Sequence, residues 1–433
     1  MVRREIIQRR EEGCSVDEVE RKYKAAIKGN PLDKGAKLDR LWEELVQLTP
    51  RPDFPFHEPS DLEEIRETRP EGPRATGYAP SDEELYDRTY GAWLGRCAGC
   101  LLGKPVEGWP RDRIEGYLRL AGGYPLDNYF PLITPLPEGY RLHPSYREAV
   151  LGSIECMPRD DDMDYTILGL HIMEEHGIDF TTENVADEWL THLPYRMVYT
   201  AERATYRNLV NGVPPRCAAS HRNPYREWIG AQIRADIWGY VTPGMPELGA
   251  EYAYRDAALS HVKNGIYGEM FVSAMISTAF TTDDVVEIIE TGLSEIPGSS
   301  RLAEAARNVL DWSKEHDNWQ GAWDRVMKEY GGYHTVHTIN NAALVLLGLL
   351  YGSGDFERTI VLSVMGGLDT DCNGATAGSI IGAILGAEAL PGKWIDPLDD
   401  RVKSVVLGFT DMRISDLAKR TCAVREEVHE QRS

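Results

Sequence analysis

Residues 91–103 read GAWLGRCAGCLLG, and residues 374–386 read GATAGSIIGAILG. Each stretch has a glycine at every fourth position, which aligns the glycines along one face of a helix. A glycine costs about 1 kcal/mol of helix propensity relative to alanine, so such a helix needs a compensating interaction. Close approach of two helix backbones supplies one. We predict that the two helices pack together antiparallel, with the end of the first beside the start of the second. Two separate helices with bulky partners are the alternative.

From about residue 83 onward, apolar residues recur at helical spacing and strand-like alternation is scarce. Two segments, 104–150 and 211–247, are instead rich in proline, glycine and aromatic residues, which predicts long loops. These patterns predict an all-α fold. The predicted helices cover residues 161–176, 185–210, 248–261, 265–280, 283–294, 301–316, 320–330, 338–352, 355–364, 374–388 and 399–407.

The N-terminal part differs from the rest. Residues 1–50 have the apolar spacing of amphipathic helices, whereas residues 50–80 contain repeated prolines. We therefore expect an N-terminal helical extension with a Pro-rich linker (1–80) and a main domain (81–433). The extension is expected either to pack on the main domain or to form a subunit contact in a homo-oligomer.

Composition limits the location and the partners. The chain has 433 residues and a net charge of −22, which argues against general nucleic-acid binding because that binding depends on neutralising phosphates. No apolar run reaches the roughly 18 residues that span a bilayer, and the N-terminus has no apolar signal core. We therefore expect a cytoplasmic protein with no membrane partner. Cys97 and Cys100 are interpreted as small core residues, with a redox or zinc role as the alternative.

Two acidic clusters each precede a predicted helix. Asp160, Asp161 and Asp162 stand in succession, and Asp369 and Asp371 form an Asp-x-Asp after a glycine pair. A helix start favours one or two acids, but three in succession repel one another unless a cation neutralises them. Oxygen ligands suit Mg²⁺, Mn²⁺ or Ca²⁺. The clusters therefore predict a site for two divalent cations, Mg²⁺ first among them, of the kind that activates water for hydrolysis.

These motifs resemble, in the same order, those of the ADP-ribosylglycohydrolase family. That family includes the dinitrogenase reductase-activating glycohydrolase and the hydrolases of ADP-ribosyl acceptors such as arginine and serine. Residues 91–108 look like its opening motif, 161–166 like its first metal motif and 366–375 like its second. Residues 260–268 (SHVKNGIYG) are similar to its middle segment. The resemblance covers roughly residues 83–410.

The resemblance implies a compact multi-helix domain with two Mg²⁺ ions in a cleft. It also implies cleavage of an N- or O-glycosidic bond, by metal-activated water, in an ADP-ribosyl or related ribosyl substrate that is a small molecule or an ADP-ribosylated protein. Glu107 and Asp162 are the candidates for the catalytic base. The predicted metal-site residues are Asp160, Asp161, Asp162, Asp369, Asp371 and the adjacent Cys372. The predicted substrate-binding residues are Glu202, Arg234, Ser260, His261, Asn264, Gly265, Tyr267, Gly268 and Gly367.

Some positions depart from the family's common pattern. Asp160 and Cys372 stand where the family commonly has threonine, and Cys100 stands where it often has aspartate. An added carboxylate changes the charge of the site, and a thiol is a poor ligand for Mg²⁺. The substrate therefore stays open. The alternatives are an N-glycosidase for a small nucleoside-like metabolite and a non-catalytic ADP-ribose-binding relative.

The loop that contains residues 223–236 is polar and aromatic, which is unusual for core. In one interpretation it lines a cleft, where Arg226 or Arg234 faces a phosphate and Trp228 or Tyr225 stacks on a base. In the other it is a structural loop held by salt bridges.

Overall fold

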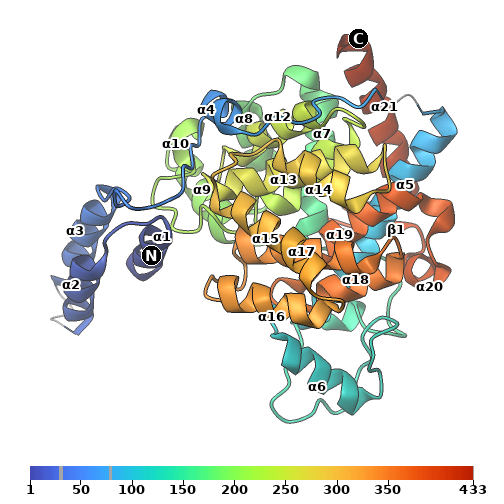
Figure 1. Cartoon of the computed structure of the whole chain (residues 1–433), viewed down its shortest axis with the longest axis horizontal. Coiled ribbons are helices and arrows are strands. Elements are labelled where there is room, and N and C mark those ends of the chain that lie inside the picture. Colours follow the sequence, from blue (N-terminus) through green and yellow to red (C-terminus); the bar gives the residue numbers. More distant parts are fainter. Residues whose placement is uncertain (29–32, 78–79, 433) are drawn as a thin grey trace.

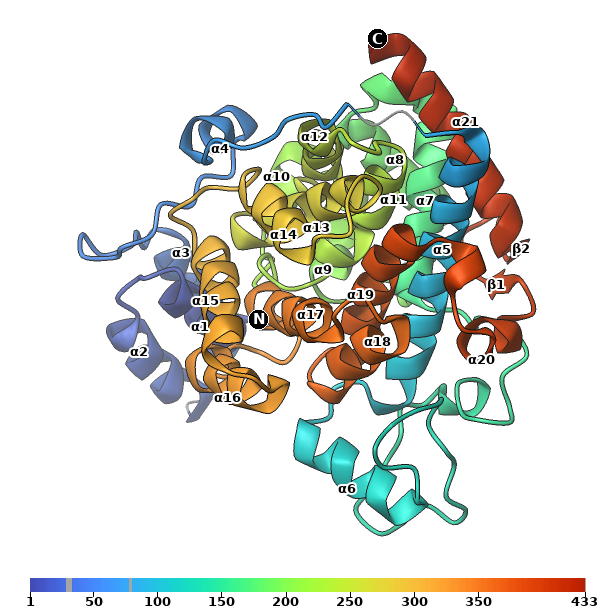
Figure 2. The same ribbon diagram turned by 45° about the vertical axis from the view of Figure 1, so that its right-hand side comes forward.

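The two glycine-rich helices lie side by side (Figures 1 and 2). In the computed structural model, α5 (Asp82–Gly103) runs antiparallel to α19 (Thr370–Leu385). A Cβ atom built on Gly99 would lie 1.9 Å from the carbonyl oxygen of Gly374, and the same backbone contact recurs at each turn. A side chain cannot occupy that space, so the glycine stripe exists to bring the two backbones together. The predicted antiparallel packing is confirmed.

Other helices surround this pair and bury most of the remaining core. Helix α13 (Asn264–Ala279) is buried along its whole length and packs against α12 (Pro246–Ala257) and α14 (Val285–Leu293). On another side, α17 (Thr338–Gly352) and α18 (Phe356–Met365) pack together and against α19. The position of α19 is therefore fixed from several sides at once.

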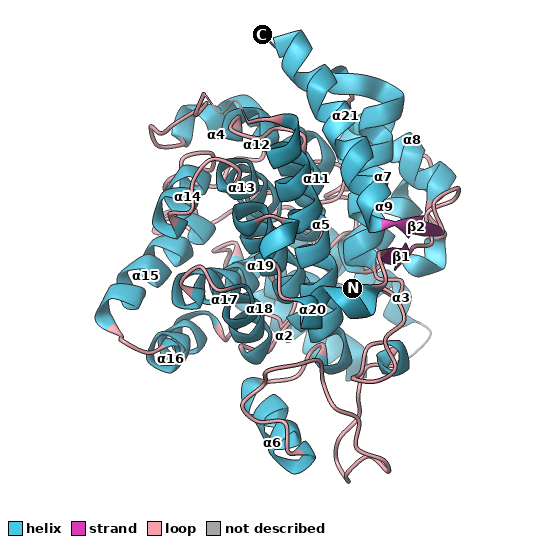
Figure 3. Ribbon diagram, turned by 90° about the vertical axis from the view of Figure 1, so that its right-hand side faces the viewer, coloured by secondary structure: helices cyan, strands magenta, loops and turns pink. Residues whose placement is uncertain are grey.

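The structure describes residues 1–28, 33–77 and 80–432. Within these ranges the regular structure is helical apart from one short antiparallel hairpin, so the predicted all-α fold is confirmed (Figure 3). The remaining elements are α1 (Val2–Glu11), α2 (Asp17–Lys28), α3 (Lys34–Val46), α4 (Leu62–Thr68), α6 (Arg111–Ala121), α7 (Asp161–His176), α8 (Thr182–His192), α9 (Thr200–Val210), α10 (Pro215–Ala218), α11 (Asp236–Tyr240), α15 (Arg301–Glu315), α16 (Trp319–Tyr330), α20 (Gly392–Ile395), β1 (Arg401–Lys403), β2 (Asp411–Arg413) and α21 (Ile414–Arg432).

Two predicted helices differ from the structure. The segment 185–210 is not one helix but two, α8 and α9, because the chain before Pro194 is extended, as the residue before a proline usually is. The helix predicted at 399–407 is wrong, since β1 pairs there with β2. Asp399 and Asp400 have φ angles of 49° and 50°, which a helix does not allow. Helices α4, α6, α10, α11, α20 and α21 lie outside the predicted segments.

The N-terminal extension packs on the main domain through α1. Helices α1, α2 and α3 bury a small apolar cluster of their own. Arg226 of the main domain lies 2.8 Å from Glu5 and 2.9 Å from Glu12. Gln8 Nε2 also donates to a carboxylate oxygen of Glu227 at 2.6 Å. These side chains are buried, so α1 is held by charged contacts shielded from water, while a role in a homo-oligomer stays a prediction.

Two smaller observations complete the fold. Cys97 and Cys100 are free thiols buried in α5, as expected of core residues. Among the described residues, we find no helix whose length and apolar character would let it cross a membrane.

Candidate functional site

The acidic motifs meet where α5 ends and α19 begins. Thr370 Oγ1 donates to the carbonyl oxygen of Gly103 at 2.8 Å. A Cβ atom on Gly103 would lie 2.1 Å from the carbonyl oxygen of Thr370, so only glycine permits this contact. The turn that follows α5 then places Glu107 next to Asp369 and Asp371. The glycine stripe thus delivers an acid from the first motif to the acids of the second.

A cavity of about 610 Å³ opens over this junction. Its walls come from the end of α5, the first turns of α7 and α19, and loop segments near residues 143–148 and 197–202. Carboxylates outnumber basic side chains among the lining residues. The lining residues with polar or ionisable side chains are Lys104, Glu107, His143, Ser145, Glu148, Arg159, Asp160, Asp161, Asp162, Tyr199, Thr200, Glu202, Asp369, Asp371 and Cys372.

Three overlapping triads of ligand-type side chains lie at this cavity, and one of them consists of Cys100, Asp160 and Asp162. Oxygen atoms of Glu107, Asp369 and Asp371 lie within 4.8 Å of one another. Asp162 and Cys372 form a second group with Asp371 at the same spacing. Asp371 belongs to the triad with Glu107 and Asp369 and also to the triad with Asp162 and Cys372, so it links the two groups of ligand-type side chains.

Two carboxylate oxygens in the triads have no hydrogen-bond donor among the described residues. Asp162 Oδ1 and Asp371 Oδ1 are buried and accept no hydrogen bond. The guanidinium of Arg96 forms an ion pair with Asp162 Oδ1 at 3.6 Å, whereas Asp371 Oδ1 has no cationic partner among the described residues. A buried anionic oxygen without a partner is costly, and a cation would satisfy it. The residues present therefore fit a hard divalent cation.

The pKa values of these acids also indicate that the site needs a cation. Burial, followed by the nearby Asp369 and Asp160, raises the pKa of Glu107 to about 8. Burial and Asp160 raise the pKa of Asp161 to about 8. Burial and Glu107 also raise the pKa of Asp371 well above its ordinary value. Carboxylates that repel one another in a buried site retain protons unless a cation displaces them.

Asp160 differs from its neighbours because both of its oxygens are already engaged. Lys104 Nζ forms a buried ion pair with Oδ2, and the backbone N–H of Asp162 donates to Oδ1 at 3.1 Å, which caps α7. Burial would raise the pKa of Asp160, but Lys104 outweighs it and lowers that pKa to about 2. Lys104 therefore compensates the charge that Asp160 adds relative to the family's threonine, and direct metal ligation by Asp160 stays a prediction.

Cys372 lies in the wall of the cavity and contacts a predicted ligand. Its Sγ donates to Asp162 Oδ2 at 3.4 Å. Burial and the adjacent aspartates raise the pKa of this thiol well above its ordinary value. As a neutral thiol, Cys372 orients a carboxylate, which is consistent with the poor affinity of sulfur for Mg²⁺.

Two buried side chains hold the motif backbones in place. Arg96 on α5 pairs with Asp236 at 2.7 Å and donates to the carbonyl oxygen of Asp162, also at 2.7 Å. Asn341 Oδ1 accepts from the backbone N–H of Asp369 at 3.1 Å and from the side chain of Asn373 at 2.9 Å. The first turns of α7 and α19 are thereby fixed before any cation binds.

His143 is a cavity residue that the sequence motifs do not reveal. Its Nε2 lies 3.4 Å from Glu107 Oε2, and its Nδ1 is 2.8 Å from Ser145 Oγ. Burial and the nearby Lys104 lower the pKa of His143, so the ring is neutral near pH 7. His143 lies far from Glu107 in the sequence and inside a long loop. No local sequence pattern therefore identifies it as a residue of the site.

The predicted substrate-binding residues separate into two groups. Glu202 lines the cavity. The others lie outside the lining and are buried in the scaffold behind it, and their role in substrate binding stays a prediction: Arg234, Ser260, His261, Asn264, Gly265, Tyr267, Gly268 and Gly367. Arg234 connects the groups, since it lies 3.0 Å from Glu202 and donates to Ser260 Oγ at 3.1 Å.

The two arginines of loop 223–236 face carboxylates, as the structural interpretation of that loop predicts. Arg226 pairs with α1, as described above, and Arg234 is buried among Glu202, Asp256 and Glu269. Neither lines a cavity described here.

A second cavity, of about 400 Å³, adjoins the acidic one, with Thr200 lining both. It is basic and aromatic, in contrast to the protein's overall charge. Trp228 and Tyr225, proposed from the sequence to stack on a base, lie in its wall. The lining residues are Met1, Arg4, Tyr195, Thr200, Arg203, Ala204, Arg207, Arg222, Tyr225, Trp228 and His334.

The helical fold and the acidic cavity at the junction of three helix ends define a class of all-α proteins with a carboxylate site of the metal-binding type. The family model for ADP-ribosylglycohydrolase matches residues 81–431, and the chain belongs to this family. Members of this family are typically metal-dependent, and membership in the family indicates that this protein is a hydrolase of glycosidic bonds.

The other comparisons add little. A solved structure described as an ADP-ribosylglycohydrolase-related protein complex is 20% identical in sequence, with a TM-score of 0.45, over 80% of this chain and 99% of that one. No curated protein sequence matches this chain.

Proposed function

We propose that this protein is a divalent-cation-dependent glycohydrolase that hydrolyses the N- or O-glycosidic bond of an ADP-ribosyl substrate. The observation that carries the proposal is the convergence of Glu107, Asp369 and Asp371 in one triad and of Asp162 and Asp371 in a second, with buried oxygens on Asp162 and Asp371 that accept no hydrogen bond among the described residues. Asp161, Asp162, Asp369 and Asp371 would hold two Mg²⁺ ions. When bound, such ions orient ribose hydroxyls and lower the pKa of water.

Glu107 is the favoured general base. Its side chain is 35% exposed and faces the cavity, whereas that of Asp162 is 1% exposed and accepts the Cys372 thiol. Glu107 would take the proton of the attacking water as the bond at the anomeric carbon breaks. The ring of His143 lies 3.4 Å from the carboxylate, and because burial and Lys104 lower its pKa, it does not neutralise the charge of Glu107.

The second cavity favours an ADP-ribosyl group over a simple nucleoside. In a chain of net charge −22, four arginines gather around this cavity with tyrosines and a tryptophan. Guanidinium groups bind phosphate oxygens, and aromatic rings stack on a base. Because the cavity adjoins the acidic one at Thr200, a diphosphate and adenine could lie in it while the ribose reaches the carboxylates.

Hydrolysis of ADP-ribosyl-arginine, ADP-ribosyl-serine and simple nucleosides, followed by product analysis, tests the proposal. With Mg²⁺ present we expect release of ADP-ribose from at least one ADP-ribosyl substrate, and a chelator should abolish it. Glu107→Gln should lower kcat by about 100-fold or more. Glu148→Gln is the matched control, because Glu148 lines the same cavity but is exposed and belongs to none of the triads.

Each other outcome has a defined meaning. Hydrolysis that survives the chelator contradicts the cation dependence. Hydrolysis of nucleosides alone would favour the nucleoside-type N-glycosidase. Binding of ADP-ribose with no hydrolysis of any substrate would identify a non-catalytic relative.

Arg4→Ala tests the second cavity. Arg4 lies over the ring of Trp228, 5.4 Å from its centroid. Its loss should raise KM for the ADP-ribosyl substrate about tenfold with little change in kcat, because one charged contact to the diphosphate is lost. Arg3→Ala, at an exposed neighbouring position outside the cavity lining, should leave KM unchanged. Equal values of KM in the two variants would remove Arg4 from the substrate site.

A further inference from the structure

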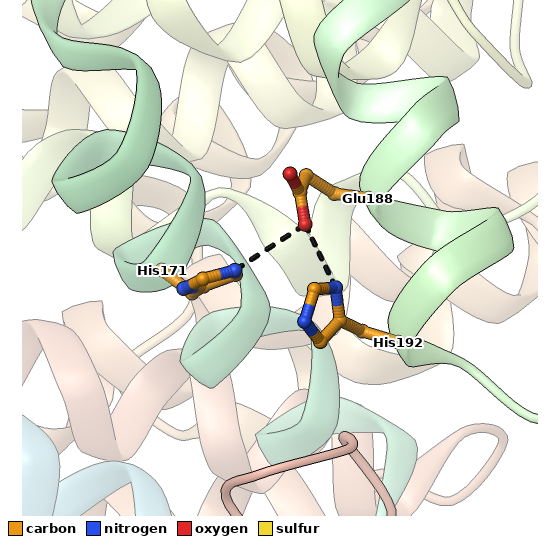
Figure 4. Close-up of side chains that lie close together, drawn as sticks. All are labelled: His171, Glu188 and His192. Atoms are coloured by element: carbon orange, nitrogen blue, oxygen red, sulfur yellow. Dashed lines mark ion pairs between the residues drawn. The ribbon is translucent and has the colours of Figure 1, made fainter.

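A cluster of histidines around one glutamate lies between α7 and α8, apart from the acidic cavity. His171 comes from α7, and Glu188 and His192 come from successive turns of α8 (Figure 4). Figure 4 shows the three side chains pointing toward one another, with His171 and His192 on either side of the carboxylate. Glu188 Oε2 is 3.3 Å from His171 Nε2 and 2.7 Å from His192 Nδ1. All three ligand atoms lie within 4.8 Å of one another.

The contact between Glu188 and His192 is not an ordinary hydrogen bond. Glu188 Oε2 and His192 Nδ1 are buried atoms, and neither has a hydrogen-bond partner among the described residues despite their short separation. Glu188 itself is only 9% exposed. The two atoms contact each other as an ion pair rather than as a hydrogen bond, and together with His171 they place three ligand-type atoms around one point.

The other oxygen of Glu188 is held separately. His176, at the end of α7, places its Nε2 2.9 Å from Glu188 Oε1. In metal sites, such a second interaction fixes the orientation of a ligating carboxylate. The cluster therefore contains three candidate ligands and a side chain that orients one of them.

The donor types fit a zinc-type ion. A tetrahedral ion with bonds of about 2.1 Å separates its ligands by about 3.4 Å. The His171–Glu188 distance of 3.3 Å matches this separation, whereas the His192–Glu188 distance of 2.7 Å is shorter, so His192 would move away from the carboxylate when an ion binds. Two imidazoles and one carboxylate suit Zn²⁺ and its neighbours in the first transition row, whereas Mg²⁺ prefers oxygen ligands alone. The side chains of His171 and His192 are 16% and 17% exposed, which leaves an entry path and room for water as the fourth ligand.

We propose that His171, Glu188 and His192 form a second metal site, for a divalent transition ion such as Zn²⁺, that ties α7 to α8. The site is separate from the acidic cavity, since His171 lies roughly 14 Å along α7 from Asp162 at the rise of an α-helix. Beyond His192, the chain runs directly into residues 195–202, which line both cavities. A bound ion would thus hold the segment that forms the wall of the active site.

Zinc binding by the full-length chain tests this site. The protein is freed of metal and equilibrated with Zn²⁺ in the presence of excess Mg²⁺, in the Asp369→Asn/Asp371→Asn background, so that zinc in the acidic cavity is not counted. We expect about one Zn²⁺ per chain. Adding His171→Asn and His192→Asn should weaken zinc binding by about 100-fold or more, because two of three ligands are lost. His57→Asn, which removes an exposed histidine elsewhere, should bind zinc as the parent does.

Cobalt provides a second measurement in the same Asp369→Asn/Asp371→Asn background, so that Co²⁺ in the acidic cavity does not contribute to the spectrum. Co²⁺ added to this protein should give the visible absorption of a four-coordinate ion. Absence of stoichiometric zinc binding, zinc binding unchanged by loss of both histidines, or a six-coordinate cobalt spectrum would each overturn the proposal. Because the readout is metal content, the site can fail while the proposed glycohydrolase activity stands, and the reverse also holds.

Discussion

Helix α7 carries two clusters of ligand-type side chains with opposite electrostatics. At its first turn, Asp162 lies among carboxylates, and burial with mutual repulsion raises the pKa values of Asp162 and Asp371. Further along, burial would raise the pKa of Glu188, but His176, His171 and His192 outweigh it and lower that pKa. In the first cluster the neighbours of the acids raise their pKa values, whereas in the second the neighbouring imidazoles lower the pKa of Glu188. The chemical type of the neighbours therefore decides which ion suits each end of the helix.

The largest expected effect comes from Asp371, which belongs to one triad with Glu107 and Asp369 and to another with Asp162 and Cys372. Asp371→Asn should lower kcat for the ADP-ribosyl substrate by about 1,000-fold or more, because it removes a ligand from both proposed cations. The double variant His171→Asn/His192→Asn should retain activity within about tenfold, since it leaves the carboxylates intact. Steady-state kinetics measures kcat for both variants. If kcat falls by a similar factor in each, the acidic cluster is not the one on which catalysis specifically depends.

Gly99→Ala tests how the acidic cluster is built. The added Cβ would lie 1.9 Å from the carbonyl oxygen of Gly374, so α5 and α19 must separate, at a cost of about 3 kcal/mol in the free energy of unfolding. Gly35→Ala in α3 is the control: its Cβ would meet nothing within 4 Å, and the change should stabilise by about 0.5 kcal/mol. Urea denaturation measures both.

Any Gly99→Ala protein that remains folded sharpens the comparison. Its affinity for Mg²⁺ should fall, because the two glycine helices position the carboxylates. Its affinity for Zn²⁺ should not change, because the contact between α7 and α8 does not involve those glycines. Loss of zinc binding alone would contradict this account of how the two sites are held.

Lys104→Met tests charge compensation in the acidic cluster. It should lower the free energy of unfolding by about 3 kcal/mol, because the buried Asp160 carboxylate loses the ammonium group that pairs with it. Adding Asp160→Thr should recover much of that loss. Denaturation with chelator present measures both variants. If the double variant is as unstable as Lys104→Met alone, the lost stability does not come from the interaction between Lys104 and Asp160.

The same pair predicts a pH dependence. The pKa of Asp160 falls from 3.8 to about 2 on folding, so the ion pair stabilises the fold above the ordinary value and this contribution disappears as pH falls toward 2. Lys104→Met should therefore be less destabilising, relative to the unaltered chain, at pH 2 than at pH 7. An equal effect at both pH values would argue against the ion pair.

The parts of the site that follow from local spacing could be predicted from the sequence. The glycine period predicts the contact of α5 with α19, and that contact carries Glu107 to Asp369 and Asp371. Acids at a helix start predict ligands because their mutual repulsion is evident within a few residues of chain. Apolar spacing, however, misassigned 399–407 as a helix, since valines in a short strand and its following loop can imitate helical spacing.

The remaining features depend on tertiary packing. The pairing of Lys104 with Asp160 joins residues far apart in the chain. Glu188 and His192 stand one helical turn apart, but His171 joins them only because α7 packs on α8. Likewise, the partners of Arg226 lie in the N-terminal extension, so its charge alone suggested a phosphate contact that the structure does not support.

Counting bound Mn²⁺ per chain tests the central claim, that the acidic cavity holds two cations sharing Asp371, most directly. The count is made by equilibrium dialysis in the His171→Asn/His192→Asn background, which removes the histidine cluster as a competing site. We predict about two Mn²⁺ per chain, with both sites strongly weakened by Asp371→Asn. No stoichiometric Mn²⁺ binding, or the same two ions in Asp371→Asn, would contradict it.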